Sequence, residues 1–328
     1  MTASYVLSRA SLLIAAAMLL AGCRGIVSPG QFSQTATGIS TLPIVSGLGQ
    51  RASKGARVGK PEGSWMLAEA KTNTLLYISD DAGGVNVYTY PAGKLVGQIG
   101  GFDVGGLCSD RAGHVFVTSP FYHDVDEFAH GGTQPIATFL GPGSEFNPAS
   151  CSIDPGSNNL AVESADSNSV YIFKHEGQSA TVYKNPFSYG VYCSYDGSGN
   201  FFVRGTQYHI AELPKGLSAF TNIKLSRPVK DLEGFAWDGK YLSIIGTPAA
   251  NIDYRIRVRG ARATIVSSSI LTGAKSPRQF TIYHHHLIVP DQFAGQVTIW
   301  RYPRIGKPIA VIEQGLVEPE GSAISVAR

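Results

Sequence analysis

The feature that most constrains the fold of this 328-residue chain is a repeat that runs through most of its length. Four aspartates mark it, because they follow one another at intervals of 44, 42 and 42 residues: Asp110, Asp154, Asp196 and Asp238. Each follows a short apolar stretch and opens a polar turn, as in GLCSDRAGHVFVTSP and VYCSYDGSGNFFVRGTQ. A further strand-like stretch recurs in step, as VNVYTYP, DVDEFAH, VYIFKHE, IAELPKG, YRIRVRG and VTIWRYP. One unit of four short strands is therefore predicted several times over.

A repeat of this length is typical of the blades of a β-propeller. Asp-Gly and Gly-Asn pairs supply the positive φ of tight hairpins, and alternating Val, Ile, Tyr and Phe suit half-buried strands. No stretch after residue 60 shows a sustained helical period. The sequence predicts an all-β fold over residues 61–328, a six-bladed β-propeller of four-stranded antiparallel blades. The blades are expected at about 64–102, 103–143, 146–186, 188–228, 231–274 and 276–316.

The two ends of the repeat region resemble each other, which bears on how the ring closes. KPEGSWMLAEA lies at the start of the first blade, and EPEGSAISVA follows the sixth. One of these copies either closes the ring or begins an incomplete seventh blade, so a seven-bladed ring is the alternative. The strand-like segment at 41–46 is a further candidate for that role.

The N-terminus has the features of an export signal. The apolar run SLLIAAAMLLAGC is too short to span a bilayer stably and is typical of a secretory signal. The sequence from Leu20 to Cys23 resembles a bacterial lipobox, in which the cysteine is acylated after cleavage. This resemblance implies a signal peptide over 1–22 and lipidation of Cys23; an ordinary secretory signal is the alternative. Residues 23–60 are expected to be a flexible linker.

The blade pattern also resembles known families. The stretch LLYISDDAGGVNVYTYPAGKLVGQIGGF is similar to the bacterial propellers of the broad NHL and YVTN group, and more closely to uncharacterised propeller lipoproteins. The resemblance covers nearly all of 62–328. It implies the fold and says little about activity, because propellers host many unrelated functions.

Charge narrows the range of partners. The formal net charge of +3 is too small for an electrostatic footprint on nucleic acid, so no nucleic-acid partner is expected. The lipobox-like sequence favours an exported lipoprotein that is held in the membrane by its N-terminal lipid. It would lie on the periplasmic side of the outer membrane or at the cell surface. There it would act as a binding or scaffolding module for an unknown protein, small molecule or glycan, and no cofactor is predicted.

The family resemblance implies which loops would contact a ligand. In such propellers the inter-blade loops and the loops between second and third strands crowd one face. The candidates from second-to-third loops are Asp80, His123, Asp166, Tyr208 and Asp291. The inter-blade loops supply Arg278 and several carboxylates. That these loop aspartates only cap turns remains an alternative interpretation.

The alternative function is enzymatic. Glu62-Gly63-Ser64-Trp65 is similar to the motif that carries the first metal ligand in the gluconolactonase–regucalcin family, and Glu233-Gly234-Phe235 is a looser match. That resemblance implies a metal-dependent hydrolase or lactonase with Ca²⁺ or another divalent cation in the channel, held by Glu62, Glu233 or Glu320. The chain lacks the PNG motif that supplies the family's asparagine ligand.

Three cysteines recur in register with the repeat. Cys108, Cys151 and Cys193 are spaced by 43 and 42 residues, in the first strand of three successive blades. Repetition favours a packing role for these small side chains near the axis. A disulfide between adjacent blades and a reactive or metal-binding thiol are the alternatives.

The run His284, His285 and His286 suggests a zinc site at first sight. In register with the other blades, however, it replaces the turn between first and second strands. Consecutive residues near a strand point alternately, so one ion cannot easily collect all three. A surface turn is therefore predicted.

Overall fold

The computed structural model describes residues 63–101, 103–143, 145–165, 167–175, 177, 179–187, 190–205, 209–246 and 251–328. All of them belong to one compact unit, Gln50–Arg328. The predicted signal peptide, Cys23, the linker and Glu62 lie outside these residues. Regular structure within them is β-strand apart from two short 3-10 turns, η1 (Ala68–Lys71) and η2 (Gln292–Ala294). No helix in this part of the chain is long and apolar enough to cross a membrane.

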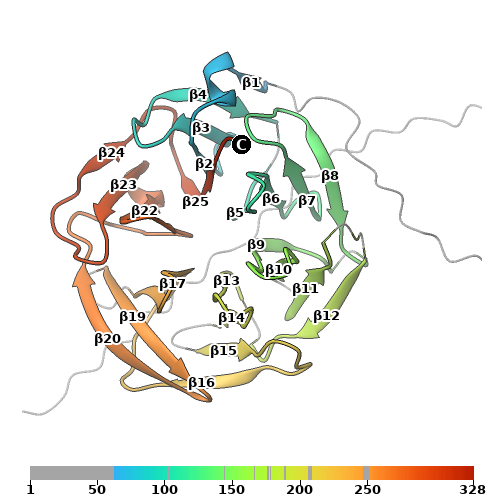
Figure 1. Ribbon diagram of the computed structural model, residues 1–328, viewed down its shortest axis with the longest axis vertical. Helices are drawn as coiled ribbons and strands as arrows, with labels where there is room; N and C mark the ends of the chain where they lie inside the picture. The colour runs from blue at the N-terminus through green and yellow to red at the C-terminus, as the bar shows by residue number, and fades with distance from the viewer. Residues whose placement is uncertain are drawn as a thin grey trace, which may run out of the picture. The chain divides into compact units, whose positions relative to one another are not determined.

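The C-terminal segment closes the ring of strands (Figure 1). The closing sheet is antiparallel, in the order β25 (Pro319–Ser325), β2 (Leu75–Asp80), β3 (Gly84–Thr89), β4 (Leu95–Ile99) and β1 (Trp65–Met66). Strand β25 pairs with β2 along its length, with a bulge near the end of β2. The tail EPEGSAISVA therefore supplies the innermost strand, whereas the similar segment at the start adds two residues at the outer edge.

Three further sheets are four-stranded and follow the chain order outward from the axis. The first contains β5 (Leu107–Ser109), β6 (Val115–Ser119), β7 (Asp124–Phe128) and β8 (Pro135–Leu140). The second contains β9 (Pro148–Ile153), β10 (Leu160–Ser164), β11 (Ser169–Phe173) and β12 (Ala180–Lys184). The third contains β21 (Thr281–Tyr283), β22 (His286–Asp291), β23 (Gln296–Arg301) and β24 (Ala310–Ile312).

The remaining sheet has eight strands. One half contains β13 (Cys193–Tyr195), β14 (Phe201–Arg204), β15 (Ile210–Leu213) and β16 (Thr221–Leu225). The other contains β17 (Leu232–Trp237), β18 (Leu242–Gly246), β19 (Ile252–Arg259) and β20 (Arg262–Ile270). Each half is an antiparallel ladder, and a short parallel pairing of β16 with β20 joins them. The chain is therefore a propeller of antiparallel four-stranded blades, as the repeat predicts.

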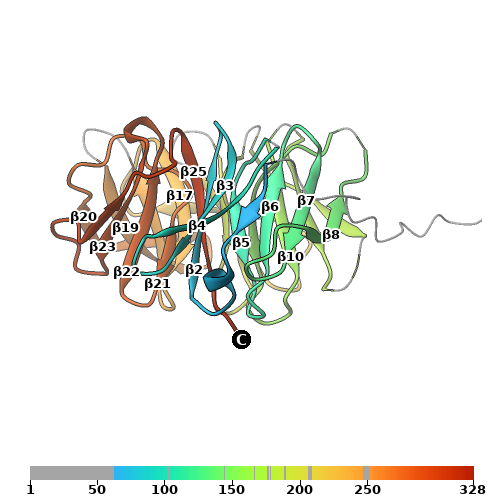
Figure 2. The same cartoon turned by 90° about the horizontal axis from the view of Figure 1, so that it is seen from above.

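Alternating strand direction distributes the connections over two faces (Figure 2). We call the loop face the one that carries the inter-blade segments and the loops between second and third strands. The turn face carries the turns between first and second strands, and the C-terminus emerges there. Asp196 shows why aspartate recurs in those turns. Its carboxylate accepts hydrogen bonds from the backbone N–H groups of Ser198 and Asn200, at 2.8 and 2.9 Å.

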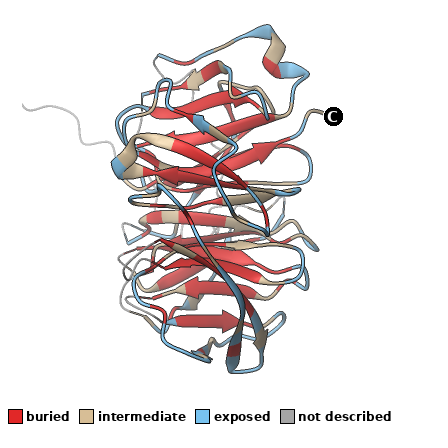
Figure 3. Cartoon of the chain, turned by 90° about the vertical axis from the view of Figure 1, so that its left-hand side faces the viewer, coloured by how far each residue is buried: buried red, intermediate tan, exposed pale blue. Residues whose placement is uncertain are grey.

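Buried residues are concentrated in the strands (Figure 3). Apolar side chains of neighbouring sheets form the core clusters, which lie between blades. Phe139 of β8 contacts Phe173 of β11 edge-on, with ring centroids 5.3 Å apart. Period-two alternation supplies such side chains from both surfaces of each sheet, because a blade inside the ring has a neighbour on either side. The second strands β2, β6 and β10 are accordingly buried at every residue.

Two of the three repeated cysteines are bonded to each other. Cys108 of β5 and Cys151 of β9 form a disulfide between adjacent blades, with Cα atoms 5.6 Å apart. The favoured packing role is therefore wrong for this pair, because the inner strands approach closely enough for a covalent bond. The packing prediction is confirmed for Cys193, whose thiol is free and buried.

The histidine run forms the β21–β22 turn, as predicted. His284 has a positive φ of 52°, and His284 and His285 are exposed. His286 already belongs to β22, and its Nδ1 is hydrogen-bonded to the Tyr90 hydroxyl. The three imidazoles thus have different environments.

Candidate functional site

A cavity of about 450 Å³ opens on the loop face beside the inner strands. Its charged and aromatic walls come from the starts of these strands and from the end of β14: Tyr192, Arg204, Glu233, Arg278 and Glu320. Every inner strand begins on the loop face close to the axis. Residues that are distant in sequence but occupy this position in their blades are therefore brought together.

Arg278 lies between two carboxylates in this cavity. Its Nε is 3.4 Å from Glu320 Oε1, and its Nη1 is 4.0 Å from Glu233 Oε2. Gln292 extends the network, because its Oε1 accepts a hydrogen bond from Arg278 Nη2 while its Nε2 donates to Glu320 Oε1 at 2.5 Å. One guanidinium thus links carboxylates from β17 and β25.

Burial raises the pKa of three carboxyl groups on this face. Burial raises the pKa of Glu320 to about 7, although Arg278 opposes the shift. Burial also raises the pKa of Asp81, to about 6, with the nearby carboxylate of Asp103 adding to the effect. The pKa of Glu233 is raised by burial against the opposing charges of two arginines. Such groups can donate or accept a hydrogen bond near neutral pH.

Tyr192 and Arg204 form another wall of the cavity. The Arg204 guanidinium carbon lies 5.0 Å from the centre of the Tyr192 ring, within the range of a cation–π contact. Burial raises the pKa of the Tyr192 hydroxyl, so that it remains a neutral hydrogen-bonding group. The pair contributes a neutral hydroxyl and a fixed positive charge to the cavity lining, whereas the ring itself is almost fully buried.

Two predicted ligand-face residues have a structural role. Asp80 accepts hydrogen bonds from the backbone N–H groups of Ala82, Val317 and Glu318, at 3.0, 2.7 and 3.2 Å. Asp291 likewise accepts from Lys275, Ser276 and Ala294, at 2.6, 2.8 and 3.2 Å. Both side chains are buried and end the second strands of their blades. They hold adjacent loops in place.

The remaining predicted residues fall into three groups. His123 is exposed on the loop face, and its Nδ1 is hydrogen-bonded to the Phe146 backbone oxygen at 2.8 Å. Asp166 and Tyr208 lie outside the described residues, as does Glu62. Glu233 and Glu320 are brought into one cavity, on either side of Arg278.

The sequence also contained signals for residues that we did not single out. Tyr192 directly precedes the repeated Cys193, so the cysteine register alone places it at the start of an inner strand. Arg204 ends the second strand of its blade, in the position of Asp80 and Asp291.

The donor set of the cavity fits a divalent cation poorly. A cation held by Glu233 and Glu320 would have to lie beside the guanidinium that already bridges them. The cation and the Arg278 guanidinium would repel each other because both are positively charged, so the arginine would have to move away. Arg278 thus lies where a cation shared by Glu233 and Glu320 would have to bind.

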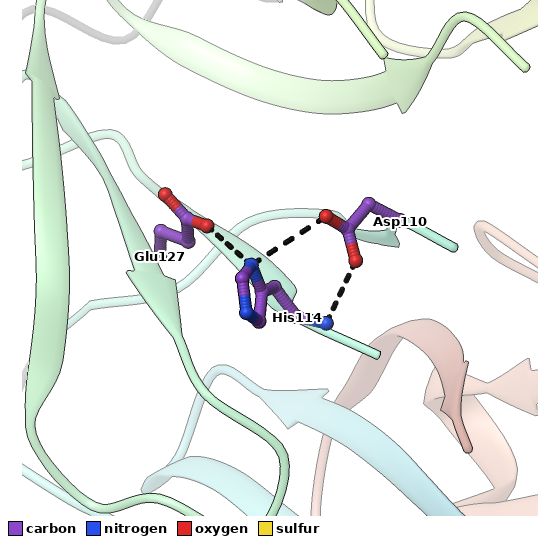
Figure 4. Close-up of side chains that lie close together, drawn as sticks. All are labelled: Asp110, His114 and Glu127. Carbon is purple, nitrogen blue, oxygen red and sulfur yellow. Dashed lines mark hydrogen bonds and ion pairs between the residues drawn. The ribbon is translucent and has the colours of Figure 1, made fainter. Parts of the chain in front are cut away.

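A second cluster lies on the turn face (Figure 4). Asp110 follows β5, His114 precedes β6, and Glu127 lies opposite in β7. His114 Nδ1 is 2.7 Å from Glu127 Oε1 and 3.5 Å from Asp110 Oδ2, while the His114 backbone N–H donates to Asp110 Oδ1 at 2.8 Å. Asp110 and His114 therefore come from the β5–β6 turn and Glu127 from β7 of the same blade.

Comparison with solved structures identifies the chain's fold as a β-propeller. A chain from a crystal structure of a nidogen/laminin complex matches with a TM-score of 0.64 at 13% identity, over 78% of this chain and 100% of that one. A protein of unknown function from Bacteroides caccae matches with a TM-score of 0.57 at 10% identity, over 77% and 99% of the two chains.

A third structure is a catalytically inactive virginiamycin B lyase from Staphylococcus aureus with quinupristin. It matches with a TM-score of 0.55 at 15% identity, over 79% of this chain and 90% of that one. No family profile and no curated protein matches the sequence. These low identities establish the fold alone, which is a β-propeller as predicted.

Proposed function

We propose that this protein is a binding or scaffolding module whose ligand is recognised in the loop-face cavity. The observation that carries the proposal is the convergence of Arg278, two carboxylates of raised pKa and the Tyr192–Arg204 pair in about 450 Å³. A space of this size suits a small polar molecule, or the end of a peptide or glycan. The charged and hydroxyl groups that line this cavity suit a ligand that itself carries polar groups.

We further infer that the ring has six blades. The two antiparallel ladders of the eight-stranded sheet match the other blades in strand number and direction, and only a two-residue parallel pairing joins them. Each ladder also begins with its own inner strand, β13 or β17. Counting the ladders as separate blades agrees with the spacing of the repeat.

Export and lipid anchoring at Cys23 complete the proposal. The lipobox-like sequence ending at Cys23 supports it, as does the Cys108–Cys151 disulfide, because disulfides persist in oxidising compartments. The module would then act at the bacterial cell envelope, held in the membrane by acyl chains.

The enzymatic alternative is less well supported. A hydrolase or lactonase of the gluconolactonase type needs a channel cation, and Arg278 lies between the carboxylates that would hold it. The structural likeness to a lyase extends to the fold at 15% identity and carries no catalytic residues to this chain.

A thermal-shift screen tests the binding proposal. Short peptides and oligosaccharides are added to the full chain in detergent, and the melting midpoint is recorded. A compound that stabilises the wild type should stabilise Arg278→Gln and Tyr192→Phe less. The matched control is Arg111→Gln, which removes an exposed arginine on the turn face. Shifts that persist in the first two variants, or the absence of any shift across the panel, would count against the proposal.

A further inference from the structure

The turn-face cluster has the donor atoms of a metal site. Asp110 Oδ2, His114 Nδ1 and Glu127 Oε1 all lie within 4.8 Å of one another. One imidazole nitrogen and two carboxylate oxygens form a mixed N/O set, which suits zinc and neighbouring transition metals better than calcium. We propose that these three residues bind a first-row divalent metal ion, with Zn²⁺ as the reference ion.

The charge of the cluster supports this proposal. A carboxylate only accepts hydrogen bonds, so His114 Nδ1 must carry the proton that it shares with Glu127 at 2.7 Å. Even with a fully protonated imidazole, one positive charge faces two carboxylates. A divalent cation with a neutral imidazole would balance both carboxylates. If both ring nitrogens are protonated, the ion replaces the Nδ1 proton, which leaves to solvent, and Nε2–H stays. If only Nδ1 is protonated, the proton moves to Nε2 and none is released.

The corresponding turn of another blade shows what a purely structural aspartate does. Asp196 uses both oxygens at short range, because Oδ2 also accepts from Asn200 Nδ2 at 2.9 Å. Asp110 Oδ2 has only longer contacts, 3.4 Å to Asn158 Nδ2 and 3.5 Å to His114 Nδ1, although its side chain is 3% exposed. This nearly buried oxygen is left with weak partners.

The residue at the third donor's position differs from blade to blade. Glu127 pairs with Phe116 in the β6–β7 ladder, and the matching position of the next blade is Ile172, paired with Ala161. The blade after that has a glutamate there, Glu212, paired with Phe202, but Asn200 takes the place of His114 in its turn. The imidazole therefore distinguishes this cluster, because histidine is a much commoner metal ligand than asparagine.

Space for an ion and its remaining ligand lies next to the cluster. A cavity of about 270 Å³ between this blade and the next is lined by His114 and Glu127 on one side and by Asn158 and His175 on the other. Two ligands of a tetrahedral zinc ion lie about 3.3 Å apart, so the Glu127 carboxylate must withdraw slightly from His114. Its side chain is 15% exposed and faces that cavity. The fourth position can be taken by water.

Zinc titration of the full chain tests the proposal. The protein is purified in detergent, stripped with a chelator and titrated calorimetrically in two buffers of different protonation enthalpy. We expect one Zn²⁺ per chain and release of at most one proton. His114→Ala and Glu127→Gln should each weaken binding by at least about tenfold. The control is His285→Ala, which removes an exposed turn histidine from another blade.

Each of the following outcomes would overturn the proposal of a metal site at Asp110, His114 and Glu127. Absence of zinc binding in the wild type does so directly, as does unchanged affinity in both His114→Ala and Glu127→Gln when their melting midpoints show folded protein. Loss of binding in His285→Ala would place the ion at the histidine run, and loss in Glu320→Gln would place it in the loop-face cavity. Ligand recognition at that cavity is independent of this cluster, so failure here leaves the proposed function standing.

Discussion

The disulfide between inner strands gives a prediction whose size follows from the structure. Cys108 and Cys151 lie 43 residues apart in sequence, and their bond crosslinks neighbouring blades. Closing a loop of this length removes enough entropy from the unfolded chain to stabilise the fold by about 4 kcal/mol. The double variant Cys108→Ala/Cys151→Ala should therefore be less stable by up to that amount. For a chain of this size, this corresponds to a melting midpoint lower by roughly 8–16 °C.

Thermal and urea unfolding of the double variant and the wild type measure this loss. The matched control is Cys193→Ala, which truncates the buried, unpaired cysteine in the same register of the next blade. Its loss should be confined to packing, at about 1 kcal/mol. Non-reducing peptide mapping should show the 108–151 linkage. If both thiols prove free, or if the double variant is no less stable than the control, the reasoning about the inner strands is wrong.

Three further predictions concern the loop face, the ring closure and the anchor. Glu320 has a raised pKa of about 7, so its contribution to stability is full below pH 4.5 and is lost as the pH rises through 7. The melting midpoint of Glu320→Gln should accordingly fall less than that of the wild type between pH 5 and pH 8. The corresponding difference in the free energy of unfolding is at most roughly 3 kcal/mol. Equal falls of the two midpoints would contradict this prediction. Asp80→Ala leaves three backbone N–H groups without their acceptor and should cost roughly 2–4 kcal/mol in urea unfolding. Asp81→Ala, at the adjacent position, serves as its control, and similar losses in both variants would refute the role of Asp80 in holding the segment before β25. Cys23→Ser should move the protein from the membrane fraction to the soluble fraction, and retention in the membrane would refute lipid anchoring.

The repeat was sufficient to predict the fold, because the turn aspartates and strand spacing are local properties of each blade. Ring closure was left open because two segments, KPEGSWMLAEA and EPEGSAISVA, share the stretch Pro-Glu-Gly-Ser, so that either could supply the closing strand. Pairing of β25 with β2 decides it in three dimensions. The disulfide was likewise out of reach, because it depends on the distance between inner strands of different blades.

The candidate site was predicted only in part, for a related reason. Glu233 and Glu320 were among the candidates, but their bridging by Arg278 depends on three separate inner strands converging. Asp80 and Asp291 were chosen for their loop positions, yet each ends a strand and accepts backbone N–H groups of a neighbouring loop. The sequence places an aspartate in a loop, whereas only the packed ring shows whether its carboxylate oxygens are available to a ligand or are used by backbone N–H groups.

Locating a bound ligand tests the central claim, recognition at the loop-face cavity, most directly. Hydrogen–deuterium exchange is compared with and without the compound that gives the largest thermal shift. We predict slower exchange at 103–106, 190–192, 232–234 and 276–279, which border that cavity. Protection confined to the turn face, at 109–113, 152–153 and 236–237, would contradict the claim.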